Sequence, residues 1–335
     1  MSMFNYQIAG SAFESCPIDL VYGLVYTNED IVEIPKKIPF RRGWGMAETF
    51  NVIDRSPRSY PSALEICYLS IRERKAYESR VVFPDELFPM LWQPFYEYVI
   101  FGMAPNGKIA VWFGGEKKSA LICAIKAHET DVDMADVAPF NPTMSLENYC
   151  SQFDLEYGDD TSFYLNLFES CVKQYNYRYC VLAEPTDSEK KGIDIGNDAD
   201  KKHLVVDWIE DALCDGSYDK SHDGGLSTYH MGGRPHKMNI ALHKGKVEWL
   251  VSLWFDDEVV KRFFERFYGA HPETKTDFII RIDAENKKYE LALYRQGLKE
   301  PVVMPEAAYQ LIVFKNKFED YRSENYNRPR GAWVW

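Results

Sequence analysis

The sequence predicts an α+β protein made of two related ββαββ-type units, each with a mainly antiparallel sheet packed by helices. Two observations lead to this fold class. Runs of β-branched and aromatic residues alternate with short turns and amphipathic stretches, and the same order of elements returns some 172 to 180 residues later. A chain of 335 residues, 46% of them hydrophobic, is long enough for two domains, which we place at 1–160 and 161–335.

The first copy begins with a hairpin over residues 64–83, after which Pro84 opens a helical segment. The stretch FGMAPNGKIAVWFGG at 101–115 follows. Its Asn106-Gly107 pair accepts the positive φ of a tight turn, so we interpret the stretch as a second hairpin. A phosphate-binding glycine loop would lead from a strand into a helix, whereas this turn leads into a strand.

The second copy covers residues 237–296. It contains a predicted hairpin at 237–255, an amphipathic helix at 256–269 and another hairpin at 277–294. Its second turn keeps an asparagine, Asn286, at an offset of 180 from Asn106 but has none of the first turn's glycines. A phosphate-binding loop would not tolerate that loss, and a hairpin would.

The flanking segments complete the predicted fold. Strands are expected at 5–10, 18–26, 119–129 and 177–185, and helices at 162–175, 201–216 and 305–322.

The charge and the termini narrow the function classes. A formal charge of -12 argues against a nucleic-acid binder, because phosphate contacts need clustered Lys and Arg. The N-terminus lacks a signal-peptide pattern, and no apolar run is long enough for a transmembrane helix. Seven cysteines without a CxxC pair indicate reduced thiols. We therefore expect a cytoplasmic protein that does not bind a membrane.

Two acid-rich segments carry the negative charge. Residues 124–162 hold nine acidic residues against Lys126, and residues 187–223 hold eleven against five lysines. An acidic face beside aromatic residues would attract a basic protein partner, although both segments also fit a solvated connecting region. The residues that we predict to contact a partner are Asp154, Glu156, Tyr157, Asp159, Asp160, Trp208, Glu210, Asp211 and Tyr218.

A metal site is the main alternative. His222, His230, His236 and His243 lie near Asp223, but their spacings of 8, 6 and 7 contain no short ligand pair. We expect no metal, cofactor or catalytic residue, and keep a metal-dependent hydrolase built on residues 214–243 as an alternative function. Trp44, between Gly43 and Gly45, would either expose its indole to a ligand or plug a loop against a sheet, and we favour the plug.

The first copy resembles the DUF2931 family, whose function is unassigned. The resemblance lies in Gly43-Trp44-Gly45, the strand at 64–66, Tyr77, Pro84 and above all GMAPNGKIAVWFGG at 102–115, and it covers residues 4–160. Family genes often accompany contact-dependent and type VI secretion toxin clusters. The resemblance therefore implies an immunity protein that binds a toxin, and it supplies no catalytic residues. The lipidated N-terminus of some members is missing, which weakens a third reading as an envelope-associated interaction module.

Overall fold

The computed structural model describes residues 3–13, 16–36, 39–40, 43–50, 57–153, 173–183, 204–244, 246–283 and 285–315. These residues form two compact units. The first unit holds the described residues before 154 together with Asp215–Ser217, and the second holds the other described residues from Lys173 onward. Within these ranges, no helix is long and apolar enough to cross a membrane.

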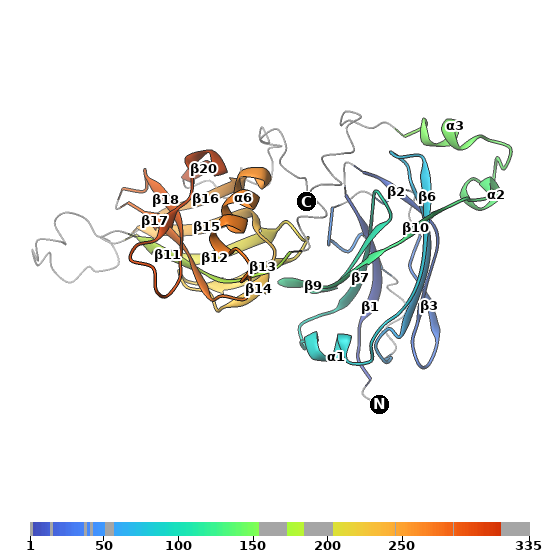
Figure 1. The fold of residues 1–335 in the computed structure, drawn as a ribbon, viewed down its shortest axis with the longest axis horizontal. Helices are drawn as coiled ribbons and strands as arrows, with labels where there is room; N and C mark the ends of the chain where they lie inside the picture. Colours follow the sequence, from blue (N-terminus) through green and yellow to red (C-terminus); the bar gives the residue numbers. More distant parts are fainter. Residues whose placement is uncertain are drawn as a thin grey trace, which may run out of the picture. The chain divides into compact units, whose positions relative to one another are not determined.

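The first unit contains two sheets, with strand orders β9-β8-β7-β1-β4 and β10-β6-β5-β2-β3 (Figure 1). Neighbouring strands are antiparallel, except that β1 and β7 run parallel. The elements are β1 (Gln7–Ala12), β2 (Ile18–Tyr26), β3 (Ile31–Glu33), β4 (Thr49–Phe50), β5 (Ala63–Ser70), β6 (Lys75–Val82), α1 (Leu87–Leu91), β7 (Tyr98–Ala104), β8 (Lys108–Gly114), β9 (Lys118–Lys126), β10 (His128–Thr130), α2 (Met134–Val137) and α3 (Leu146–Cys150).

The core of the first unit lies between its two sheets. Phe101 and Val111 on β7 and β8 belong to the same buried cluster as Leu64 and Tyr68 on β5. Because successive side chains of a strand point to opposite faces, each strand contributes every second residue to this core. The unit is therefore a β-sandwich.

The second unit also contains two sheets, with strand orders β19-β18-β17-β11-β14 and β20-β16-β15-β12-β13. The strands β11 and β17 run parallel. The elements are β11 (Tyr175–Ala183), β12 (Val205–Leu213), β13 (Tyr218–Asp223), β14 (His230–Gly232), β15 (Pro235–Lys244), β16 (Val247–Phe255), α6 (Asp257–Tyr268), β17 (Thr276–Ile282), β18 (Tyr289–Tyr294), β19 (Val302–Val303), η2 (Glu306–Ala308) and β20 (Tyr309–Lys315).

In the second unit, α6 joins the core between the sheets. Val260 and Phe264 of this helix pack with Tyr175 of β11 and Ile240 of β15. The N-cap residue of the helix is Asp256, whose carboxylate accepts a hydrogen bond from the backbone N–H of Val259 at 2.9 Å. The predicted amphipathic helix at 256–269 is confirmed.

The second unit repeats the strand order of the first. Adding ten to each strand number of the first unit reproduces both sheets of the second, including the parallel pair. The helices α1 and α6 occupy equivalent places, between β6 and β7 and between β16 and β17. The hairpins predicted at 101–115 and 277–294 are confirmed as β7-β8 and β17-β18. Their turns place Asn106 at φ 56° and Asn286 at φ 57°.

The left-handed backbone at Asn106 predicts a measurable cost of substitution. At positive φ a Cβ crowds the backbone, and alanine lacks the short polar side chain by which asparagine tolerates this conformation. Asn106→Ala should therefore destabilise the first unit by about 1 kcal/mol. Glycine adopts this φ without strain, so Asn106→Gly should lie within about 0.5 kcal/mol of wild type. Urea unfolding of the two variants measures both values, and equal stability of the alanine and glycine variants would show that the turn is not strained.

The predicted α+β fold class is wrong, because the described part of the chain is mostly β-sheet, with 51% of these residues in strands and 11% helical. Residues 201–216, predicted as a helix, contain strand β12, and the predicted helix at 305–322 contains η2 and strand β20. Both segments are rich in β-branched and aromatic residues, and their hydrogen-bond partners β15 and β16 are distant in sequence. The helix predicted at 162–175 lies almost wholly outside the described residues.

The sheets are also not packed mainly by helices. In the first unit α1 has five residues, and sheet packs against sheet. The strands predicted at 5–10, 18–26, 119–129 and 177–185 are present as β1, β2, β9 and β11, with boundaries shifted by a few residues.

Trp44 is a buried plug, as predicted. Its side chain is 3% exposed, and its ring stacks on Phe13 with centroids 4.4 Å apart. It also meets the ring of Trp112 edge-on at 4.7 Å. The indole N–H of Trp112 donates to the backbone oxygen of Asp215 at 2.9 Å. This arrangement leaves the Trp44 indole no surface for a ligand.

Candidate partner-binding surface

One sheet of the first unit has an outer face that points away from the core. The strand register places three rows of side chains on this face. Two rows run across β6, β5, β2 and β3, and the third runs across β10, β6, β5 and β2. The rows are Val82, Ala63, Tyr26 and Ile31; Arg80, Glu65, Leu24 and Glu33; and His128, Glu78, Cys67 and Tyr22. Val82 and Ile31 are 76% and 58% exposed, so one end of this face is open to solvent and apolar.

Two tyrosines on this face are held by carboxylates. The hydroxyl of Tyr22 donates to Glu78, whose other oxygen lies 3.8 Å from Nε2 of His128. Burial, and then the bond to Glu78, raise the pKa of Tyr22 well above its usual value. Glu65 raises the pKa of Tyr26 through a hydrogen bond and also pairs with Arg80 at 2.9 Å. The tyrosine rings are thereby fixed on a partly acidic sheet surface.

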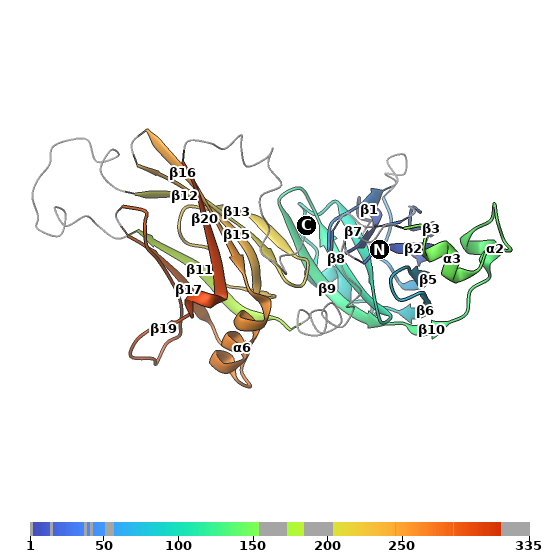
Figure 2. The same ribbon diagram turned by 90° about the horizontal axis from the view of Figure 1, so that it is seen from above.

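A cap of two short helices covers the other end of this face. Figures 1 and 2 both place α2 and α3 on the outer side of the sheet. Val137, Tyr149 and Cys150 of the cap are buried against Leu69 and Val21 of β5 and β2. Helices of four and five residues are not stable alone in water, so docking onto the sheet holds them in place.

The segment from 127 to 153, which contains the cap, is acidic throughout. It holds five exposed carboxylates and no Lys or Arg; these residues are Glu129, Asp131, Asp133, Asp136 and Glu147. Two of them pair with neighbours, Glu129 with Lys75 at 2.8 Å and Glu147 with Arg74 at 2.5 Å. The sequence of residues 1–172 and 215–217 contains 25 acidic against 14 basic side chains, a net -11 of the chain's -12. Nearly all of the net negative charge of the chain therefore lies in the first unit.

Phe140 is fully exposed on the loop between α2 and α3. The loop is ordered by backbone hydrogen bonds from Asn141 to Ala138 at 2.8 Å and from Met144 to Asn141 at 3.1 Å. Holding a whole phenyl ring in water forgoes the favourable burial of an aromatic side chain, which a partner would restore. We call the cap together with the three rows of the open face the capped face.

A buried carboxyl lies beneath the cap. Asp19 of β2 is 3% exposed and accepts a hydrogen bond from the hydroxyl of Tyr149 on α3. Burial raises the pKa of Asp19 from 3.8 to about 6, against the opposing effects of Tyr149 and Lys36. The cap thus rests on a carboxyl that changes charge in a mildly acidic range.

The structure describes only some of the predicted contact residues. Asp154, Glu156, Tyr157, Asp159 and Asp160 lie outside the described residues, as does the side chain of Trp208 on β12.

Three predicted contacts on β12 and β13 are described. Glu210 is half-buried and pairs with Lys220 at 3.2 Å, and the ammonium of Lys220 lies 5.5 Å from the ring of the half-buried Tyr218. Asp211 is 1% exposed and accepts a hydrogen bond from the backbone N–H of Asp219 at 2.9 Å. Asp211 therefore supports the fold of the second unit, while Glu210 and Tyr218 stay predictions as contacts.

The sequence patterns did not reveal the three rows of residues on the sheet. Tyr22, Tyr26, Glu65 and Glu78 come together only through strand register, which no local pattern reveals. Phe140 did have a local signal, because it stands between two prolines in a polar stretch, the sequence APFNP.

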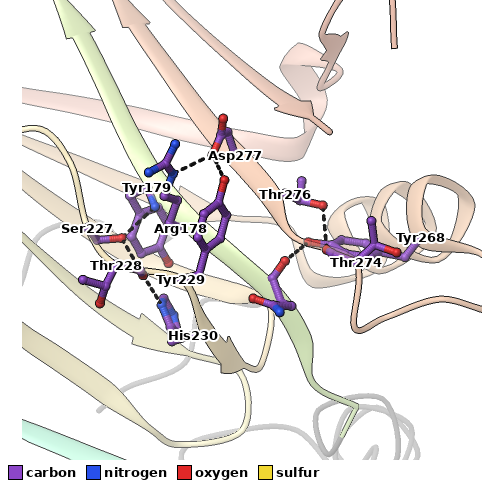
Figure 3. A network of polar contacts seen from close by, with 11 residues as sticks. Arg178, Tyr179, Ser227, Thr228, Tyr229, His230, Tyr268, Thr274, Thr276 and Asp277 are labelled. Carbon is purple, nitrogen blue, oxygen red and sulfur yellow. Dashed lines mark hydrogen bonds and ion pairs between the residues drawn. The ribbon is translucent and has the colours of Figure 1, made fainter. Parts of the chain in front are cut away.

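A polar network in the second unit forms a further cluster, shown in Figure 3. One oxygen of Asp277 accepts hydrogen bonds from Nε of Arg178 and from the hydroxyl of Tyr229, both at 2.7 Å. The guanidinium carbon of Arg178 lies 4.5 Å from the centre of the Tyr229 ring. Ser227, two residues earlier, exchanges hydrogen bonds with Tyr179 at 2.8 and 3.0 Å. These contacts attach the segment before β14 to β11 and β17, which is a structural task.

Three histidines of the predicted metal segment have separate surroundings, whereas the side chains of His222 and Asp223 lie outside the described part of the structure. His236 is 1% exposed and lies 3.7 Å from the carboxylate of Asp257, whereas His243 pairs with Asp207 at 2.7 Å. His230 packs against the ring of Tyr177 with centroids 4.9 Å apart. In the described part of the chain, no group of three or more His, Cys, Asp or Glu side chains is arranged to hold a metal ion.

Comparison with known proteins bears on the first unit. No curated protein and no solved structure matches the chain. One family model does match, over residues 39–163, and this range includes β5 to β10, α2 and α3. The match confirms the family resemblance that Trp44 and the glycine-rich hairpin suggested: residues 39–163 of this chain match the DUF2931 family model, which is described as a protein of unknown function.

Proposed function

We propose that the protein is a non-enzymatic binding protein of the immunity type. It acts in the cytoplasm and neutralises a cationic toxin, such as one delivered by type VI secretion, by covering its active surface with the capped face. The observation that carries this proposal is the docked acidic cap, in which Phe140 is fully exposed and the segment before and after it carries exposed carboxylates. An exposed aromatic residue in an acidic segment is typical of a protein-binding surface.

The chemistry of the capped face supports binding rather than catalysis. The thiol of Cys67 has its pKa raised to about 11 by burial, so this group is not an activated nucleophile. Glu78 and Glu65 are each engaged by a tyrosine hydroxyl and a basic side chain. A basic protein surface would exchange these partners for its own Lys or Arg side chains at little cost, because the existing pairs are partly exposed.

The product of the neighbouring gene provides the test. We expect the purified product to bind this protein with one-to-one stoichiometry and to lose its toxic activity on binding. Calorimetry measures the binding, and an activity titration measures the inhibition. Glu300→Gln removes an exposed charge from the second unit at a position that is not a predicted contact, and this control should leave both the binding and the inhibition unchanged. A neighbouring product that neither binds nor is inhibited would overturn the proposal.

A further inference from the structure

The cap is joined to the sheet by contacts of two kinds. An apolar cluster places Tyr149 and Cys150 against Leu69 and Val21, and the buried carboxyl of Asp19 accepts the hydroxyl of Tyr149 within the same interface. At the rim, Glu147 of α3 pairs with Arg74 at 2.5 Å, where both side chains are about half exposed or more. The Asp19 contact is therefore the buried polar contact by which α3 is held.

We propose that the cap is a proton-controlled lid, which docks firmly when Asp19 is protonated and loosens when Asp19 is ionised. An ionised carboxylate is costly to bury, whereas a lifted cap returns Asp19 to water. Lifting would also uncover Cys67, Leu69 and Val21, which continue the open face. Regulation of partner binding by this lid rests on the proposed function. The motion of the lid does not depend on that function.

The groups around Asp19 compensate its negative charge only in part. Tyr149 and Cys150 face it from α3, and the pKa of each is raised by burial, so both stay neutral in the relevant range. Lys36, beyond β3, favours the ionised form but weighs less than burial. Arg74 and Glu147 are paired with each other. Leu69, the neighbour of Asp19 on β5, is apolar.

The direction of the pH effect follows from linkage. With the cap docked, the pKa of Asp19 is about 6, and its ordinary value is 3.8. An acid whose pKa is raised by docking stabilises the docked state below its ordinary pKa, and this stabilisation is lost as the pH rises through the raised pKa. Between pH 5 and pH 7 the opening equilibrium should therefore increase about tenfold.

Hydrogen exchange of peptides from α2 and α3 tests the lid in the free protein, with rates corrected for the intrinsic effect of pH. Wild type should show about tenfold more opening at pH 7 than at pH 5. Asp19→Asn keeps an oxygen that accepts the Tyr149 hydroxyl but cannot ionise, so its opening should be low and independent of pH. Peptides from β16 in the second unit should keep their protection throughout and serve as the internal control.

Alkylation of thiols at pH 7 gives a second measurement. Cys67, beneath the cap, is 4% exposed, and Cys150, on α3 of the cap, is 3% exposed; both should react more slowly in Asp19→Asn than in wild type. Cys214, which is 6% exposed elsewhere, should react equally in the two proteins. Tyr149→Phe should open more than wild type at pH 7 and keep its pH dependence.

The same pH dependence in Asp19→Asn as in wild type would overturn the lid. Failure of the neighbouring gene's product to bind would instead contradict the proposed function and leave these exchange results intact.

Discussion

Replacing Asp211 by alanine should destabilise the second unit by about 3 kcal/mol. The carboxylate is buried, accepts the backbone N–H of Asp219 at 2.9 Å and is also bonded to the hydroxyl of Tyr179. Tyr179 is itself fully buried. The alanine variant leaves a buried donor without its acceptor and opens a cavity beside the bulge between β12 and β13.

Two matched variants isolate the cause of this effect. Asp211→Asn keeps an acceptor oxygen without the charge, so we expect it to recover most of the loss. Glu210→Ala removes the neighbouring carboxylate, which is partly exposed and paired with Lys220, and should cost less than about 1 kcal/mol. Urea unfolding measured by a probe in the second unit gives all three values. If Asp211→Ala lost no more stability than Glu210→Ala, the structural role that we assign to Asp211 would be wrong.

Neutralising the cap should slow partner association about tenfold at low salt. The variant combines Asp131→Asn, Asp133→Asn and Asp136→Asn, and asparagine preserves the α2 N-cap that Asp133 forms with the backbone N–H of Ala135. Phe140→Ala should act on dissociation instead, raising its rate by about thirtyfold, since a buried aromatic anchor contributes about 2 kcal/mol or more. Stopped-flow measurement over a range of salt separates the two effects.

Controls for both changes lie elsewhere on the first unit. Asp85→Asn, Glu86→Gln and Glu97→Gln change three exposed charges by the same total amount near α1. Met90→Ala removes an apolar side chain that is 76% exposed. Both controls should leave the association and dissociation rates within about twofold of wild type. Equal slowing by the two charge variants would mean that net charge, rather than the cap, attracts the partner.

Sequence patterns predicted the local elements well. The hairpins at Asn106 and Asn286 and the helix α6 were found because turn residues, caps and helical spacing are all short-range signals. The fold class was wrong because β12 and β20 also satisfy a helical spacing over a short window. Their strand state depends on β15 and β16, which no local pattern could supply.

The candidate site was predictable only in part. The acidic segment 124–162 did mark the neighbourhood of the cap, since its described part includes α2 and α3. The sequence did not show that those helices dock onto the sheet, or that Tyr22 and Glu78 lie in one row across it. Asp211 was predicted to contact a partner, but its side chain faces the interior of the second unit, which its acidic character did not indicate.

The capped face is the surface that we propose to bind the partner. Hydrogen exchange of the complex with the neighbouring gene's product, compared with exchange of the free protein, locates the surface that is covered. We predict slower exchange in peptides covering 22–33, 63–82 and 128–150, with no change in peptides covering 276–294. Protection confined to the second unit, with the cap exchanging as in the free protein, would contradict the account.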